Sequence, residues 1–201
     1  TLDVQEVGSL NANSKALLGV NPHSSHINVT RVNGITTVVA QPSGGVVSGQ
    51  TAIINLNGST QADMAVVPVH ALVINFPRVT AGGGFGGFGG FAQPPADFAE
   101  LIRRRDAAVD ALKKTFRDVE AYARMVEAYA KDKTVPTPVT SLRYEALVPY
   151  VRGQKPIYFT VERERDIRAV AKFVSEMKVK GIIVGGQDAW KAADELKRNN
   201  I

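Results

Sequence analysis

The chain has 201 residues, 44% of them hydrophobic and 21% charged, which is typical of one globular domain with a sizeable core. Lysine and arginine outnumber aspartate and glutamate by 24 to 19, but they are dispersed apart from residues 103–105, so we expect no nucleic-acid partner. Cysteine is absent, which excludes disulfides, thiolate metal sites and cysteine nucleophiles and gives no indication of the compartment. No apolar run reaches the length of a transmembrane helix, so we expect no membrane insertion.

The first part of the chain predicts short elements separated by turns. Short helices are expected at residues 14–18 and 28–33, and β-branched strands at 35–42 and 51–56. The glycine-rich SGGVVSGQ between these strands fits a structural turn or a ligand loop, and no Lys-Ser/Thr pair follows to make it a phosphate loop. His23 and His26 lie three residues apart in a polar segment, where they are either loop residues or a metal-binding pair.

The apolar run at residues 64–76 predicts a buried strand that contains His70. A lone histidine in such a strand is either a hydrogen-bonded core residue or a ligand-binding group. The segment AGGGFGGFGGF at residues 81–91 follows, and its glycines favour a connector or a lid over substrate.

Two helices are predicted next. An apolar stripe with helical spacing indicates a long helix over residues 96–131, which the prolines of TVPTPVT separate from a second helix at 141–152. Ser141 is the expected N-cap of the second helix. The last part of the chain, residues 155–190, alternates strand, helix, strand and helix, with Trp190 in the buried row of the final helix.

This alternation predicts parallel strands joined by helical crossovers. Chemistry in such sheets lies where strands end and helices begin, which points to residues 160–163 and 185–188. Glu162 is the candidate catalytic acid or base there, and Arg163 is a candidate anion clamp. Gly185, Gly186 and the helix start near Gln187 offer backbone N–H groups to a carboxylate or phosphate.

The chain resembles the amidohydrolase superfamily, in the branch related to imidazolonepropionase. The resemblance spans nearly the whole chain, and the residues that carry it lie at 21–24, 29–58, 71–77, the Gly/Phe loop at 81–91, 142–167 and 182–196. It implies an α/β fold that is part of a (β/α)₈ TIM-type barrel, with about half of the parallel strands. Residues 1–201 would form an incomplete barrel domain, and residues 81–140 a helical insertion made of the Gly/Phe-rich loop and the long helix.

The resemblance also implies hydrolysis of C–N bonds in amides or cyclic amides, with zinc as the metal of the intact family. The family places metal-binding histidines at two strand ends where this chain has Thr160-Val161-Glu162 and Val184-Gly185-Gly186, and Asn55 stands in the position of the metal-binding lysine. We therefore expect no metal ligands in this chain, although Glu162 remains a possible ligand in a modified site.

Three interpretations stay open from the sequence. The chain is part of a hydrolase with a modified site, a non-catalytic metal-free homologue that binds a ligand, or an unrelated doubly wound α/β domain. In the first two the expected partner is a small-molecule substrate or ligand. The unpaired outer strands of a half-barrel further predict self-association, or pairing with a missing remainder of the barrel.

Overall fold

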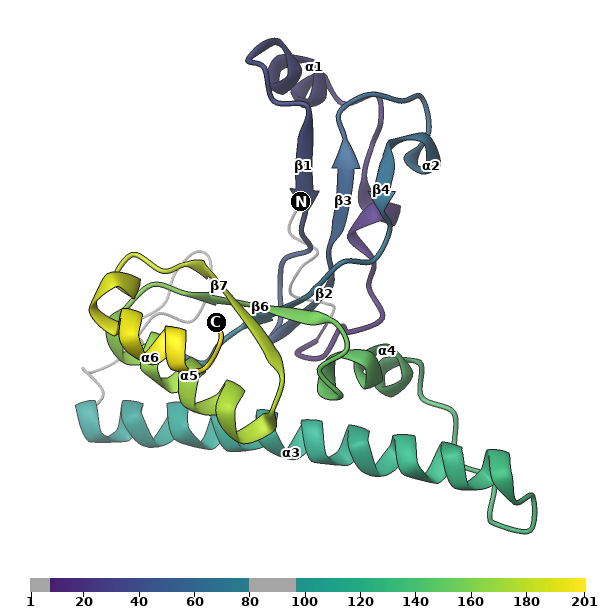
Figure 1. The fold of residues 1–201 in the computed structure, drawn as a ribbon, viewed down its shortest axis with the longest axis vertical. Coiled ribbons are helices and arrows are strands. Elements are labelled where there is room, and N and C mark those ends of the chain that lie inside the picture. The colour runs from purple at the N-terminus through teal and green to yellow at the C-terminus, as the bar shows by residue number, and fades with distance from the viewer. Residues whose placement is uncertain (1–7, 80–96) are drawn as a thin grey trace, which may run out of the picture.

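The computed structural model describes residues 8–79 and 97–201. Its strands form two separate sheets (Figure 1). The upper sheet in that view has three strands, in the order β1 (Thr37–Ala40), β3 (Ala52–Asn55) and β4 (Ala65–Val67). The lower sheet has four strands, in the order β2 (Val47–Gln50), β5 (Leu72–Asn75), β6 (Pro156–Val161) and β7 (Lys180–Gly185).

The three-stranded sheet is antiparallel and has its own small core of Ala52, Ile54, Leu56 and Met64. Three short helical elements accompany it: η2 (Ala16–Gly19), α1 (Ser25–Val32) and α2 (Gln61–Met64). Thr60 and Asp63 form a reciprocal capping box at the start of α2, in which each side chain accepts from the backbone N–H of the other residue. This cap begins a helix directly after the β3 turn and places Met64 in the small core.

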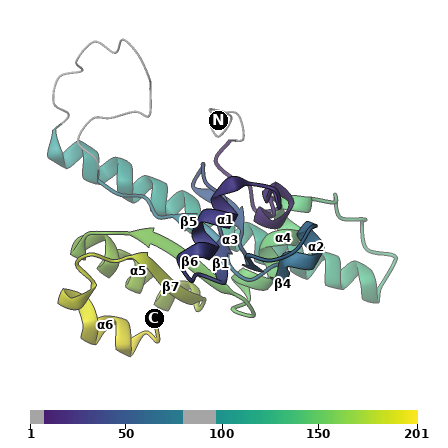
Figure 2. The same cartoon turned by 90° about the horizontal axis from the view of Figure 1, so that it is seen from above.

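The four-stranded sheet is mixed. β2 pairs antiparallel with β5, whereas β5, β6 and β7 are parallel. The crossover from β6 to β7 is α5 (Glu164–Met177), and after β7 the chain ends in η3 (Ala189–Ala192) and α6 (Ala193–Arg198). α5 and α6 lie together at one end of the molecule, away from α2 and β4 (Figure 2). The predicted strand-helix-strand-helix order of residues 155–190 and its parallel pairing are confirmed.

The long helix α3 (Phe98–Lys131) runs beneath the four-stranded sheet (Figure 1). Phe173 of α5 joins this helix to the sheet, because its ring contacts Phe116 of α3, Phe159 of β6 and Phe76 edge-to-face at centroid distances of 5.3–5.8 Å. α4 (Leu142–Val151) packs against α3. The Ser141 side chain accepts from the Tyr144 N–H, which confirms the predicted N-cap.

The prediction of part of an eight-stranded barrel is wrong. The described strands divide between two sheets, only β5, β6 and β7 are parallel, and these sheets do not close into a barrel. The reason lies in the length of the connections. Parallel neighbours need a crossover of about a dozen residues or more, whereas the short link from Asn55 to Ala65 brings β4 back antiparallel to β3.

Three local predictions also differ from the structure. The run at residues 64–76 is divided into the end of α2, β4, a turn and β5, since Pro68 interrupts strand pairing. The glycine-rich segment at residues 43–50, for which a turn or a ligand loop is predicted, contains β2. Trp190 is 74% exposed and not in the core, because it lies in the 3₁₀ turn η3 and not in α6, so the α-helical spacing on which the prediction rested does not apply to it. The predicted loop at residues 81–91 lies outside the described residues.

None of the helices in the described ranges is both long enough and apolar enough to span a membrane.

Candidate binding site at the carboxyl ends of the parallel strands

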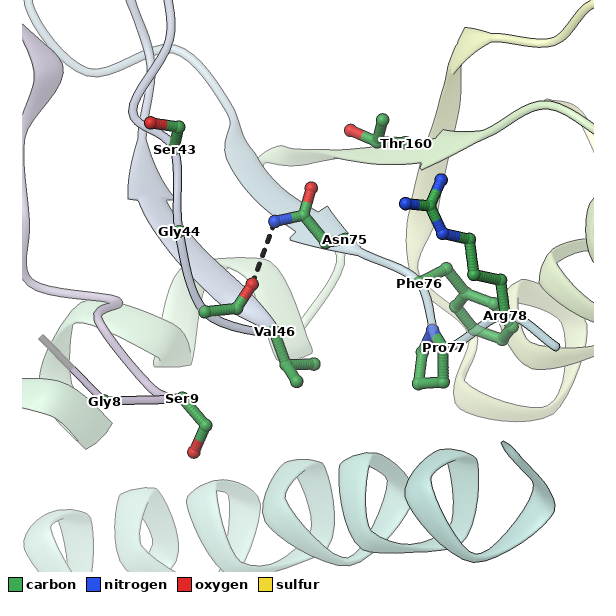
Figure 3. Close-up of a pocket in the computed structure, with 11 residues that line it drawn as sticks. Gly8, Ser9, Ser43, Gly44, Val46, Asn75, Phe76, Pro77, Arg78 and Thr160 are labelled. Atoms are coloured by element: carbon green, nitrogen blue, oxygen red, sulfur yellow. Dashed lines mark hydrogen bonds between the residues drawn. The ribbon is translucent and has the colours of Figure 1, made fainter. Parts of the chain in front are cut away.

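The carboxyl ends of β5, β6 and β7 lie side by side. The register places Asn75 opposite Thr160, and Thr160 opposite Val184. A cavity of about 830 Å³ opens beside this row, between the glycine-rich loop at residues 43–46 and the segment from Asn75 to Arg78 (Figure 3). We call it the strand-end cavity. Its position matches the place where open α/β sheets bind ligands.

Asn75 is fixed by the glycine-rich loop. Its Nδ2 donates to the Gly45 carbonyl oxygen at 2.9 Å and to Ser48 Oγ at 3.0 Å, and its backbone N–H donates to the Val46 carbonyl oxygen at 2.9 Å. Gly45 has a φ of +69°, and a Cβ there would lie 2.7 Å from the Gly8 carbonyl oxygen, so only glycine fits. Because both amide hydrogens are used, Asn75 presents Oδ1 to the cavity as an acceptor, pointing away from the loop (Figure 3).

Thr160 and Arg78 supply further polar groups. Thr160 Oγ1 is buried and has no hydrogen-bond partner among the described residues. Leaving such a group unpaired costs about 1–3 kcal/mol, so a hydroxyl retained in this state fits a position that a ligand or water completes. The Arg78 side chain is exposed at the rim, with its guanidinium on the Thr160 side of the cavity (Figure 3).

Four of the residues predicted for a site come together in a neighbouring turn. The Glu162 carboxylate packs against the backbone of Gly185, where a Cβ would overlap it, and Glu162 Oε2 accepts from the Gln187 N–H at 3.4 Å. The Gly186 N–H donates to the Val161 carbonyl oxygen at 2.7 Å. The backbone donors proposed for an external anion are therefore directed at the chain itself.

Arg163 and His70 are placed differently from this turn. Arg163 is exposed directly before α5, and its side chain caps no backbone group of that helix. His70 precedes β5 and therefore lies at the end of the sheet where the parallel strands begin, whereas Glu162 lies where they end. Its backbone N–H donates to the Thr51 carbonyl oxygen at 2.9 Å, and its ring meets Tyr158 edge-to-face at 5.8 Å. The ligand-binding roles of both residues stay predictions.

Sequence reasoning missed Asn75 and Arg78. The signal for both is present in the sequence, since an apolar strand ends at Asn75 and Phe76-Pro77-Arg78 follows, but the prediction of one buried strand over residues 64–76 gives no weight to its polar end. Thr160 lies within the strand-end segment that was singled out. The ligand-loop alternative for the glycine-rich segment fits its position beside the cavity.

The donor chemistry of the strand-end cavity does not fit zinc. Its polar side chains include an amide, a hydroxyl and a guanidinium, whereas zinc in proteins takes imidazole, thiolate or carboxylate ligands. Across residues 8–79 and 97–201, no group of three or more His, Cys, Asp and Glu side chains is arranged to hold a metal ion.

Comparison with solved structures gives an amidohydrolase from Thermotoga maritima MSB8, with a TM-score of 0.76 and 20% sequence identity. The fold is amidohydrolase-like. The match covers 96% of this chain and 47% of the other, so the chain spans about half the length of that protein. No protein-family model matches the sequence, and no curated protein matches it significantly. The predicted resemblance is confirmed at the level of the fold, and the closer relationship to imidazolonepropionase stays a prediction.

Proposed function

We propose that the strand-end cavity binds a small molecule that carries both an amide N–H and an anionic group. The observation that carries this proposal is the fixed orientation of Asn75, whose Nδ2 is held by Gly45 and Ser48 so that Oδ1 is left as an acceptor. An amide N–H of the ligand would donate to this oxygen. In this form the chain is a metal-free ligand-binding module with an amidohydrolase-like fold.

Arg78 and Thr160 supply the second half of the recognition. A guanidinium donates two parallel N–H bonds to a carboxylate or phosphate, which selects planar anionic groups. The Thr160 hydroxyl, unpaired among the described residues, gains a partner when a ligand enters. The proposed ligand therefore carries an N–H donor for Asn75 and an anionic acceptor for Arg78, as a cyclic amide with an acidic side chain does.

Isothermal titration calorimetry with hydantoin-5-acetate, and with uncharged hydantoin for comparison, tests this proposal. We expect hydantoin-5-acetate to bind, and Arg78→Gln to weaken it about tenfold or more, since hydrogen bonds to charged groups contribute roughly 1.5–3 kcal/mol. Arg143→Gln, which changes an exposed arginine on α4, is the matched control. Equal affinity for the two compounds, or no effect of Arg78→Gln, would contradict the recognition model.

A second candidate function is hydrolysis of C–N bonds in amides or cyclic amides. It is favoured by the fold shared with a protein named amidohydrolase, which is about twice as long as this chain. Glu162 would then be the acid or base. Ring opening of hydantoin-5-acetate would reveal the activity, and it can be monitored through the loss of the compound's ultraviolet absorbance. Glu162→Gln should abolish the activity with little change in melting temperature. If the variant retains full activity, Glu162 has no catalytic role.

A further inference from the structure

A second cavity, of about 510 Å³, lies at the opposite end of the parallel strands, where β6 begins. Four segments that are distant in the sequence meet around it: residues 13–15, the end of β2 at Gln50, the turn at Val69, and one side of α4 together with Lys155 shortly after it. We call it the strand-start cavity. It shares no lining residue with the strand-end cavity.

The walls of the strand-start cavity are fixed by hydrogen bonds of β2. The Gln50 backbone N–H donates to the Ser14 carbonyl oxygen at 2.7 Å, and Gln50 Nε2 donates to the Ala12 carbonyl oxygen at 2.9 Å. The preceding Gly49 has a φ of +136°, and a Cβ there would lie 2.6 Å from the Ser14 carbonyl oxygen. Residues 12–15 are thereby held against β2, and Lys15 is brought to the rim.

Tyr150 is the decisive residue of this cavity. It is 0% exposed, and its hydroxyl has no hydrogen-bond partner among the described residues. Burial raises the pKa of Tyr150 to about 12. Phenylalanine would fill the same space without an unpaired polar group, and a buried tyrosine normally finds a partner for its O–H.

The charges around the cavity favour an anion. Lys155 Nζ donates to the Val69 carbonyl oxygen at 3.1 Å, which leaves two of its three N–H groups for another acceptor. Lys15 is exposed at the rim. The acidic lining residue, Glu145, accepts from the Tyr122 hydroxyl at 3.1 Å and is therefore directed toward α3.

We propose that the strand-start cavity is a binding site for a small carboxylate, held by the Lys155 ammonium group and the Tyr150 hydroxyl, with Lys15 at the rim. Both principal groups are donors, and a carboxylate is acceptor-only with two oxygens, so it can accept a hydrogen bond from both. The site is separate from the one proposed for hydantoin-5-acetate, and either exists without the other.

Amide ¹H–¹⁵N NMR titration with succinate, and with uncharged succinamide of similar size, tests the site. We expect succinate to shift the amide signals of Ala146, Tyr150 and Lys155, while those of Val46 and Asn75 stay in place. Succinamide should cause no comparable shifts. Shifts of the same size with succinamide, shifts confined to Val46 and Asn75, or no shifts at all would overturn the proposal.

Two variants separate binding from folding. Tyr150→Phe should weaken succinate about fivefold to tenfold, since it removes one hydrogen bond to a charged group, while the melting temperature of the free protein stays the same or rises. Lys155→Gln should weaken succinate about tenfold or more. Lys197→Gln, which changes an exposed lysine on α6, is the control and should leave the affinity unchanged. Unchanged affinity in both Tyr150→Phe and Lys155→Gln would overturn the assignment.

Discussion

Asp166 is a buried carboxyl group in the first turn of α5, with only 8% of its surface exposed. Burial raises the pKa of Asp166, and the nearby positive charges of Arg165, Arg105 and Arg78 oppose this rise without cancelling it. Arg105 Nε is itself buried, and its 3.2 Å contact with Asp106 lacks hydrogen-bond geometry. The Asp166 carboxyl group and Arg105 Nε are therefore both largely shielded from solvent.

Asp166→Asn should stabilise the protein at neutral pH. A carboxyl group whose folded pKa lies above its unfolded value of 3.8 contributes stability below that value, and the contribution is lost as the pH rises through the folded pKa. Asparagine does not ionise, so Asp166→Asn does not lose stability in this way as the pH rises. Urea denaturation at a series of pH values should show an advantage of Asp166→Asn near pH 7 that disappears below about pH 4. A destabilised Asp166→Asn at pH 7 would refute the expectation.

At the scale of elements, a small polar network ties α4 to α3. The Ser141 side chain caps α4 by accepting from the Tyr144 N–H at 3.4 Å, and the Ser141 backbone N–H donates to Tyr122 Oη of α3 at 3.3 Å. Tyr122 Oη in turn donates to Glu145 Oε1. The start of α4 is thus fixed both by its own cap and by the long helix.

Ser141→Ala should lower the free energy of unfolding by about 0.5–2 kcal/mol, because one backbone N–H of the first turn loses its acceptor. Ser141→Asp keeps an acceptor at the same position and should lose much less. Guanidinium denaturation of the three proteins measures the difference. Equal losses in the alanine and aspartate variants would show that the cap contributes nothing.

The helices and the parallel strands were predictable, because their signals are local. The apolar stripe of α3, the N-cap at Ser141 and the alternation of residues 155–190 each depend on spacing within one segment. The division into two sheets was not predictable in the same way. Whether residues 37–67 continue a parallel sheet or form their own antiparallel one depends on pairing between segments, which the spacing inside each strand does not record.

The candidate site was predictable only in part, and for a related reason. Glu162, Gly185, Gly186 and Gln187 lie together as expected, since they stand at the ends of two adjacent parallel strands, but they do not line the strand-end cavity and their binding and catalytic roles stay predictions. Asn75 acquires its importance from Gly45 and Ser48, which lie far from it in the sequence and orient its amide. Tyr150 carries no sequence signal at all, because only the packed structure shows that its hydroxyl lacks a partner among the described residues.

At the scale of the whole molecule, β7 is an outer strand of the four-stranded sheet. Ile182 in this strand is 41% exposed. An uncovered apolar outer strand pairs readily with another strand. We therefore expect the chain to self-associate through β7, and Ile182→Lys to weaken the association while leaving the circular dichroism spectrum unchanged. Sedimentation velocity over a range of protein concentrations measures this, and a wild-type protein that stays monomeric throughout would contradict it.

The pairing of β5 with β6 has a consequence for how the chain reaches this structure. These parallel neighbours are separated by everything from Phe76 to Lys155, including α3 and α4, whereas β3 and β4 are joined by one short link. Closing the longer loop costs more chain entropy before any contact compensates for it, and distant pairings of this kind slow folding. The three-stranded sheet is therefore expected to form early, and both cavities, which depend on β6 meeting β5, to appear in the last steps.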